Sequence, residues 1–399
     1  MKGALTWPFL RLYILALFFF SANAILNVMI PLRGHDLGAN NTTIGIIMGA
    51  YMLTAMVFRP WAGQLISQIG PLKILRIILV INGIALVIYS FTELEGYFIA
   101  RIMQGICTAF FSMSLQIGII DALPEKDRSQ GISLYSLFSY MPGIIGPIIA
   151  VNIWHTNDMS YFMIIMIAIA LITAVFGFSA TMDSEERQTE PNLEKTPYGP
   201  VSVFMQFFKN PHLLKSGIIM LVASIGFGAV TTFIPLFTLQ TKMGNAGTFL
   251  MLQAITVVLS RFYLRKIIPS DGKWHVKFMM SILCVLMVST GLIGLSPYIG
   301  VVALYVGAVL VGISQAMIYP TLTSFLSFVL PKAGRNMLIG LFIATADLGV
   351  SLGGVLMGPI ADLTSYHMMY LICTLFIASI MFYSYEKRPS FIEGAVKTD

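Results

Sequence analysis

Charged residues are scarce in this chain. They make up 11% of its 399 residues, whereas hydrophobic residues make up 57% and the mean hydropathy is +0.83. A soluble fold of this composition would leave much apolar surface in water, whereas a lipid bilayer accepts helices of about 20 apolar residues. The shortage of charge therefore excludes an ordinary soluble protein and predicts an all-α integral membrane protein.

Cysteine is rare as well. Cys107, Cys284 and Cys373 lie in apolar segments without paired spacing, which indicates small packing residues rather than disulfides or metal ligands. The five histidines are scattered over loops and the ends of apolar runs. The sequence therefore shows no set of intramembrane metal ligands, and we expect no metal site.

Motifs for nucleotide hydrolysis are also missing. The chain has no Gly-x-x-x-x-Gly-Lys-Ser/Thr loop to hold nucleotide phosphates, and it has no His-Glu-x-x-His run. The net charge of +6 resides in short loops, which is typical of orientation signals rather than of nucleic-acid binding. We therefore expect no enzyme, no ATP hydrolysis, no nucleic-acid partner and no cofactor, and an ion gradient remains as the energy source.

Apolar runs separated by loop signals predict twelve membrane spans, with boundaries uncertain by about four residues. The predicted spans are residues 9–31, 42–65, 72–91, 97–121, 129–152, 159–180, 215–239, 246–267, 277–295, 300–328, 336–360 and 366–385. Lys and Arg concentrate in the loops after even-numbered spans. The positive-inside rule then predicts a multi-pass protein of the plasma membrane with both termini in the cytoplasm.

The second half of the chain repeats the first. Residues of the first half that recur in the second include the following pairs: Ile30 and Ile234, Pro31 and Pro235, Arg59 and Arg261, Gly70 and Gly272, Gly105 and Gly312, Leu123 and Leu330, Arg128 and Arg335. Parallel repeats of this kind place a substrate site between the halves, near the middle of the bilayer. We predict six-helix bundles at residues 1–181 and 212–399, joined by a cytoplasmic linker at 182–211.

Two predicted spans carry matching polar stripes. Residues at intervals of three or four lie on one face of a helix. In the fourth span these are Arg101, Gln104, Thr108, Ser112 and Gln116, and in the tenth they are Gln315, Tyr319 and Thr323, at the repeat positions of the last three. Such side chains commonly join helices by hydrogen bonds. Because the stripes are paired and one contains arginine, we favour a water-filled cavity that holds a small-molecule substrate.

Asp347 is the acidic residue placed deep within a span, about twelve residues and so roughly 18 Å from Arg335. An intramembrane carboxylate is a natural proton carrier or cation contact. The structural alternatives are an ion pair with Arg101 or a helix kink near Gly349. Arg101 could hold a substrate carboxylate bidentately, or it could extend to the membrane interface from its place near the end of a span.

Other polar side chains are weaker candidates for lining the same cavity, because each is as readily explained by helix packing. They are Asn23, Asn27, Tyr51, Tyr135, Tyr140, Thr231 and Gln253.

Short motifs over essentially the whole chain resemble the major facilitator superfamily. Gly63, Leu65, Gly70 and Lys73 resemble its signature between the second and third spans, although Ser67 stands where the family usually has Asp. That departure puts the usual gate contact in doubt, and Asp121 with Arg128, which match the family's charged pair, could compensate. Arg101, Gln104 and Gly105 resemble the fourth-span motif of proton-coupled exporters.

Glycine and proline motifs extend this resemblance. Gly143, Gly146 and Pro147 resemble the fifth-span antiporter motif in shortened form, and Gly354, Gly358 and Pro359 give a similar run on the eleventh span. Glycine permits close helix approach and proline disrupts backbone bonding, both useful where two halves rock against each other. The resemblance implies the fold of that family and a monomeric transporter that exchanges protons for its substrate.

A narrower resemblance, carried by residues 1–11, 320–335 and 346–358, is to exporters of opine-type metallophores within the same family. It implies a metal-free, multiply carboxylated amino acid conjugate with an imidazole as cargo. The alternatives are a multidrug antiporter for amphipathic cations, favoured if enough of the 25 methionines and 28 phenylalanines line an adaptable cavity, and a non-transporting receptor or scaffold.

Overall fold

The computed structural model describes residues 3–180, 207–331 and 335–385, and the secondary structure of these residues is helical. The first half contains α1 (Trp7–Asp36), α2 (Asn41–Ile69), α3 (Pro71–Phe91), α4 (Leu94–Ala122), α5 (Glu125–Tyr140), α6 (Pro142–His155) and α7 (Met159–Phe178). The second half contains α9 (Pro211–Thr241), α10 (Ala246–Tyr263), the short η1 (Arg265–Ile267), α11 (Val276–Ile299), α12 (Val301–Val329), α13 (Arg335–Leu363) and α14 (Tyr366–Tyr385).

Twelve segments of the described residues are long and apolar enough to cross a membrane, as the sequence predicts. Most bounds lie within about four residues of the predicted ones, the first span continues to Asp36 instead of ending at residue 31, and two others differ in a way that the neighbouring structure explains. The eighth ends at Tyr263 instead of continuing to residue 267, because η1 follows it. The fifth, Gln130–His155, is broken between α5 and α6 at Met141. Pro142 causes this break, since proline has no N–H and its ring clashes with the preceding helical turn.

Polar caps and glycines explain where several helices begin and end. The Asn40 side chain accepts a hydrogen bond from the backbone N–H of Thr43 and so caps α2, and Asn245 caps α10 in the same way through Thr248. Gly70 lies between α2 and α3 with a φ of +96°, a backbone conformation that residues other than glycine rarely adopt. This requirement is a physical reason for a glycine in the loop signature.

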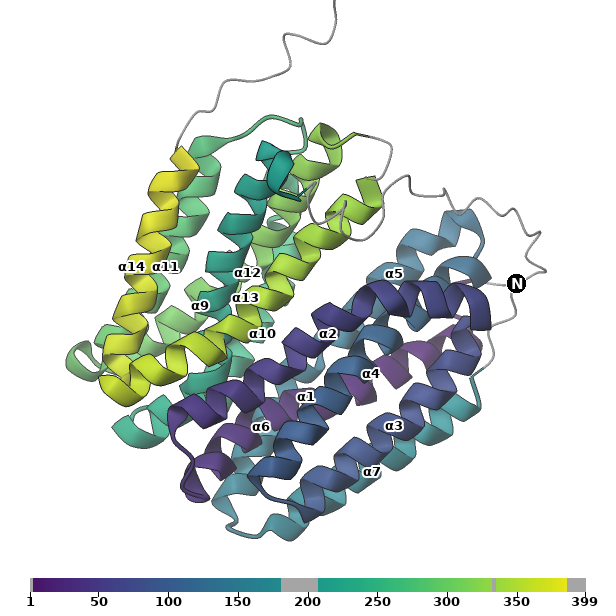
Figure 1. Cartoon of the computed structure of the whole chain (residues 1–399), viewed down its shortest axis with the longest axis horizontal. Helices are drawn as coiled ribbons and strands as arrows, with labels where there is room; N and C mark the ends of the chain where they lie inside the picture. Colours follow the sequence, from purple (N-terminus) through teal and green to yellow (C-terminus); the bar gives the residue numbers. More distant parts are fainter. Residues whose placement is uncertain (1–2, 181–206, 332–334, 386–399) are drawn as a thin grey trace, which may run out of the picture.

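The helices form two bundles, one from each half of the chain (Figure 1). They meet along two seams, where α2 packs against α13 and α6 with α5 packs against α10, and α1 also contacts α9. We call the side where α1 begins and α14 ends the termini side, and the other the opposite side. Figure 1 shows the bundles spreading apart toward the termini side. The predicted linker at 182–211 lies mostly outside the described residues, so the domain boundaries stay a prediction.

Contacts on the opposite side hold the bundles together. The Asp362 carboxylate of α13 accepts hydrogen bonds from the backbone N–H groups of Asn41 and Thr42, at 2.9 and 2.8 Å. These are the first residues of α2, where unpaired N–H groups and the helix dipole favour an anion. The Tyr366 hydroxyl also donates to the Asn41 side chain, at 2.5 Å. One half therefore caps a helix of the other.

Candidate functional site

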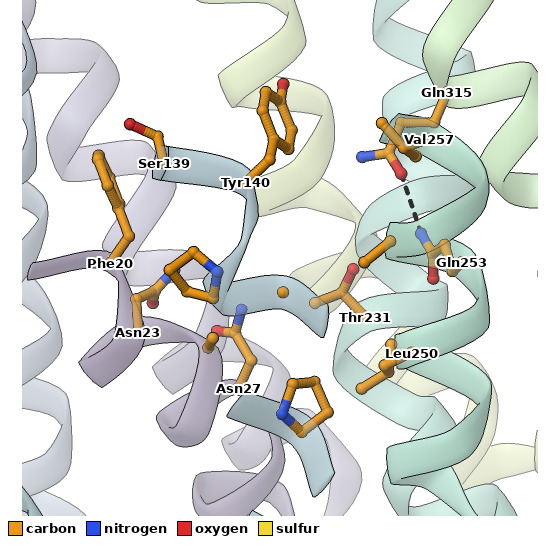
Figure 2. A pocket seen from close by; sticks show the side chains of 15 residues that line it. Phe20, Asn23, Asn27, Ser139, Tyr140, Thr231, Leu250, Gln253, Val257 and Gln315 are labelled. Atoms are coloured by element: carbon orange, nitrogen blue, oxygen red, sulfur yellow. Dashed lines mark hydrogen bonds between the residues drawn. The ribbon is translucent and has the colours of Figure 1, made fainter. Parts of the chain in front are cut away.

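A cavity of about 290 Å³ lies between the two bundles. Its walls come from α1, the α5–α6 break, α9, α10 and α12. Figure 2 shows Asn23 and Asn27 of α1 on one side and Thr231, Gln253 and Gln315 on the other. The lining residues are Phe20, Asn23, Ala24, Asn27, Ser139, Tyr140, Pro142, Gly143, Pro147, Thr231, Leu250, Gln253, Ala254, Val257 and Gln315. The site thus draws on both halves, as the repeat predicts.

Arg101 lies directly behind the two asparagines. Its side chain is 0% exposed, so it does not extend to the membrane interface. Its guanidinium donates to the side-chain oxygens of Asn23, at 2.7 Å, and of Asn27, at 2.9 Å. Because a guanidinium only donates, it fixes both amides with their oxygens toward Arg101. The N–H₂ groups of both side chains are then left to bond other partners at the cavity wall.

The charge of Arg101 has no counter-charge within ion-pair distance among the described residues. Besides the asparagines, its guanidinium contacts the sulfur of Met48 at 3.3 Å and the Tyr51 ring at 5.2 Å, and its Nε has no hydrogen-bond partner. Isolated charges in apolar surroundings are costly, and buried ones are normally paired. This wall of the cavity is therefore suited to an anion.

The second half contributes a glutamine pair. Gln253 Nε2 donates to Gln315 Oε1 at 3.0 Å, and both side chains line the cavity (Figure 2). The buried Oε1 of Gln253 has no hydrogen-bond partner. At the repeat positions in the first half, Tyr51 and Thr108 are joined by a hydrogen bond of 3.0 Å. The repeat therefore places matching polar pairs in both halves, and the glutamine pair forms part of the cavity wall.

Asp347 pairs with Arg59, not with Arg101. Arg59 Nε lies 2.8 Å from an Asp347 carboxylate oxygen, and this ion pair joins α2 to α13 across the seam between the halves. The side chain of Asp347 is 12% exposed and that of Arg59 is 33% exposed. Sequence reasoning missed Arg59 as a site residue. The available signal was an arginine inside the second span whose repeat partner, Arg261, is also an arginine.

The other stripe residues do not line this cavity. Gln104 accepts a hydrogen bond from the Tyr89 hydroxyl at 2.9 Å, within the first bundle, and Ser112 donates to the backbone of its own helix. Gln116 is exposed. Thr323 bonds the backbone oxygen of Tyr319, whose ring stacks on Phe342. Helix packing accounts for these contacts.

The loop and charged-pair motifs lie toward the termini side. A Cβ at Gly63 would lie 3.1 Å from the end of the Met113 side chain, and Lys73 is exposed near the start of α3. Asp121 lies at the end of α4. The Arg128 guanidinium donates to the backbone oxygen of Leu123 at 3.2 Å, and its repeat partner Arg335 does the same to Leu330 at 3.1 Å. The side chain of Ser67 is outside what the structure describes.

The glycine motifs mark close approaches between helices. A Cβ at Gly146 would lie 2.6 Å from Ala24, and one at Gly143 would lie 3.4 Å from Ala254, across the α6–α10 seam. A Cβ at Gly354 would lie 2.7 Å from the backbone oxygen of Gly45, and one at Gly358 would lie 2.6 Å from that of Asn41. Pro359 lies within α13 beside this seam. Gly354 and Gly358 let the bundles touch on the opposite side, whereas Gly146 allows close packing within the first bundle.

One glycine run also matches a hydrolase motif. Residues Gly349, Ser351 and Gly353 have the Gly-x-Ser-x-Gly spacing of a nucleophile elbow, which requires a strained turn between a strand and a helix. Here the run lies in the middle of α13, and Ser351 is buried. Added Cβ atoms at Gly349 and Gly353 would collide with α9. Close packing of α13 on α9 therefore explains the motif.

Replacing Gly354 with Leu is expected to open the opposite side, because the new side chain cannot fit against the Gly45 backbone. Overpacking of this kind costs about 1–3 kcal/mol. A cysteine introduced at Thr231, in the cavity, should then react faster with a membrane-impermeant thiol reagent applied from the opposite side. Gly340→Leu is the matched control, since Gly340 is on the same helix with nothing within 4 Å of an added Cβ. Equal labelling rates in the two variants would contradict this account of the seam.

Comparison with known proteins gives a consistent result. The family model for the Major Facilitator Superfamily matches residues 12–298. The chain is 64% identical over 390 residues to the staphylopine export protein of Staphylococcus aureus, covering 98% of each chain. It is 22% identical to an uncharacterized MFS-type transporter of Methanocaldococcus jannaschii, covering 90% of this chain and 92% of the relative. The structure of the nucleoside transporter NupG has the same fold, with a TM-score of 0.78, 16% identity, and coverage of 95% of this chain and 98% of that one.

Proposed function

This chain belongs to the major facilitator superfamily, and we propose that it is a proton-coupled exporter of a small carboxylated metallophore of the staphylopine type across the plasma membrane. It is a multi-pass membrane protein with twelve candidate spans. The observation that carries the proposed cargo is the 64% identity, over 98% of both chains, to a protein named for staphylopine export. The cavity between the bundles is the proposed substrate site.

The chemistry of the cavity supports a carboxylated substrate. A carboxylate would accept hydrogen bonds from the amide groups of Asn23 and Asn27, and the Arg101 charge behind them would attract it. Across the cavity, the amide groups of Gln253 and Gln315 line the wall and would bond an amine or imidazole N–H of the same molecule. A substrate with acidic groups at one end and N–H groups at the other matches these two walls.

Proton exchange would use the ion pair between Asp347 and Arg59. Protonation of Asp347 removes its negative charge, and the attraction across the α2–α13 seam then weakens. A looser seam favours separation of the bundles on the opposite side, where α2 and α13 also touch. In this proposal the termini side faces the cytoplasm, substrate enters there, and proton binding accompanies release outside. One chain contains the whole site, so a monomer suffices, and no ATP is used.

The multidrug alternative receives less support. The chain is 25% identical to a multidrug resistance protein of Bacillus subtilis over half its length. An adaptable drug cavity is expected to be rich in methionine and aromatic side chains. The lining drawn from the described residues contains no methionine, and Phe20 and Tyr140 are its aromatic residues. A receptor or scaffold would not need the Arg101 and Asp347 contacts at all.

Mass spectrometry of metal-starved cells tests the cargo. We expect deletion of this protein to make a carboxylated metallophore accumulate in the cytoplasm and disappear from the medium, and the intact chain to restore export. Arg101→Gln should fail to restore it, whereas Arg11→Gln should succeed, because Arg11 lies outside the cavity lining. Unchanged metallophore levels on deletion, together with lost resistance to cationic dyes, would favour multidrug efflux instead.

A further inference from the structure

A second hollow, of about 260 Å³, lies on the α5–α10 seam, beside the central cavity. Tyr140 lines both spaces and stands between them. The other residues of this hollow are Ile132, Ser133, Ser136, Leu137, Val258, Arg261, Phe262 and Arg265. It thus combines two arginines and the hydroxyl groups of two serines and Tyr140 with apolar side chains, and of these residues only Tyr140 also lines the cavity proposed for transport.

The two arginines have no carboxylate within ion-pair distance among the described residues. Arg261 donates to the Tyr140 hydroxyl at 2.7 Å, and its guanidinium lies 4.2 Å from the centre of the Tyr140 ring. Tyr140 offers a hydroxyl group and not a carboxylate, so no acidic side chain of the described residues offsets the charge of Arg261 at this contact. Arg265 is exposed at the start of η1. The hollow therefore carries two positive charges.

Comparison through the repeat shows that the charges of the α2–α13 seam are balanced. Tyr140 and Asp347 are separated by as many positions as Gly105 and Gly312, so Tyr140 occupies in the first half the place of Asp347 in the second. Arg59 and Arg261 also correspond in the repeat, with the same separation as Gly70 and Gly272, and both reach across to the other half. Thus Arg59 contacts a carboxylate where Arg261 contacts a phenol.

A second pair of corresponding residues also differs in charge between the two seams. In the repeat, Gly63 of α2 corresponds to Arg265, which follows α10. The α2–α13 seam therefore contains one arginine and one aspartate at these positions, whereas the α5–α10 seam contains two arginines. The two seams correspond in the repeat, and at these positions the α5–α10 seam carries the excess of positive charge.

The hollow lies where the membrane meets water. The eighth span ends at Tyr263, which is 77% exposed, and Phe262 on the lip of the hollow is 59% exposed. Aromatic side chains are enriched at this boundary. Arg265, which is exposed and follows the end of the eighth span, lines the hollow, and Ile132, Leu137 and Val258 supply its apolar surface. Lipid phosphates lie at this level, and their acyl chains extend into the apolar region.

We propose that this hollow binds the phosphate headgroup of an anionic phospholipid, held by Arg261 and Arg265 with help from Ser133 and Ser136. Arginine presents several N–H donors in a geometry that matches phosphate oxygens. Basic pockets between membrane helices on the cytoplasmic side are suited to anionic headgroups. The lipid would supply the negative charge that Asp347 supplies at the other seam. This site is independent of the transported substrate.

The test uses the purified full chain in neutral detergent with added phosphatidylglycerol or phosphatidylcholine of the same acyl chains. We expect phosphatidylglycerol to raise the unfolding temperature and to stay bound in native mass spectrometry, and phosphatidylcholine to do neither. Arg265→Gln and Arg261→Gln should each weaken the phosphatidylglycerol effect by about tenfold in concentration, or about 1.4 kcal/mol. Lys266→Gln removes the same charge one residue outside the hollow and should change nothing.

Three results would overturn the assignment. The two lipids could stabilise the protein equally, or both arginine variants could leave the effect of phosphatidylglycerol unchanged. In the third, millimolar inorganic phosphate would reproduce the full effect of phosphatidylglycerol, which would indicate a site for a soluble anion. If Arg265→Gln does not fold, Arg265→Lys keeps the charge and should weaken binding only partly. Binding is measured without substrate or a proton gradient, so its failure would leave the transport proposal untouched.

Discussion

Asp347→Asn is expected to abolish proton-driven export while leaving the substrate cavity intact. Asparagine cannot take up or release a proton, and it leaves the Arg59 charge on the seam without its carboxylate. The side chain of Asp347 is not in the cavity lining, so substrate affinity should change little. We expect proton-driven flux in vesicles to fall by about a hundredfold, because the neutral Asn side chain resembles protonated Asp347 at all times, so the seam can no longer be strengthened and weakened by proton release and uptake.

Two further variants distinguish a loss of proton coupling from a loss of folding stability. Asp36→Asn removes an exposed carboxylate of α1 and should leave transport unchanged. The double variant Arg59→Gln with Asp347→Asn removes both charges, so it should regain thermal stability relative to the single variant without regaining proton coupling. The loss of stability in Asp347→Asn should be below the roughly 3–5 kcal/mol of a fully buried pair, because Arg59 is 33% exposed. Normal proton-driven flux in Asp347→Asn would rule out its role as proton carrier.

Arg101→Gln is expected to weaken substrate binding by about a hundredfold. The change removes the cavity's buried positive charge and breaks two charge-assisted hydrogen bonds, to Asn23 and Asn27. Such bonds are worth about 1.5–3 kcal/mol each, and a hundredfold change in affinity corresponds to about 2.7 kcal/mol. Binding of the metal-free metallophore to the purified protein, measured by calorimetry, gives the affinity directly.

Smaller changes at the same wall should have graded effects. Asn27→Ala removes one amide but keeps the charge, so we expect a loss of about tenfold. Arg101→Lys keeps the charge but cannot hold both asparagines with one planar group, so its effect should be intermediate. Thermal unfolding controls for damage to the fold, because Arg101 is fully buried. Wild-type affinity in Arg101→Gln would show that the anion binds elsewhere.

The sequence predicts the architecture of this protein well, because membrane helices obey simple rules. A span needs about 20 apolar residues, and the loops need polar or turn-forming residues such as Asn40, Gly70 and Asn245. The twelve predicted spans correspond to the twelve candidate spans of the structure. The repeat also places the pair Tyr51 and Thr108 opposite Gln253 and Gln315, as the structure shows.

The candidate site was harder to predict. Helical periodicity assigns residues to one face of a helix, but it does not say whether that face meets the cavity or a neighbouring helix. Gln104 and Ser112 lie on the Arg101 stripe yet bond within the first bundle. Asn23 and Asn27 line the cavity in front of Arg101, which no single-helix pattern reveals.

The contacts across the seams could not be predicted from the sequence for a different reason. The Asp347 and Arg59 side chains are far apart in the chain and meet only because α2 and α13 pack closely through glycines. The apolar pattern of the fifth span continues past Met141, so the break before Pro142, which places Tyr140 at the cavity, was also missed. The ion pair depends on how the two bundles are placed relative to each other, whereas the break has a local signal, Pro142, inside an otherwise continuous apolar pattern.

Proton movement in vesicles tests the central claim most directly. The purified chain is reconstituted into vesicles loaded with metal-free staphylopine, and a trapped dye reports the internal pH while the metallophore leaves down its gradient. An exporter that exchanges protons for this cargo should acidify the vesicle interior as the metallophore appears outside, and Asp347→Asn should not. Release of the metallophore without any pH change, or no release at all, would contradict the proposal.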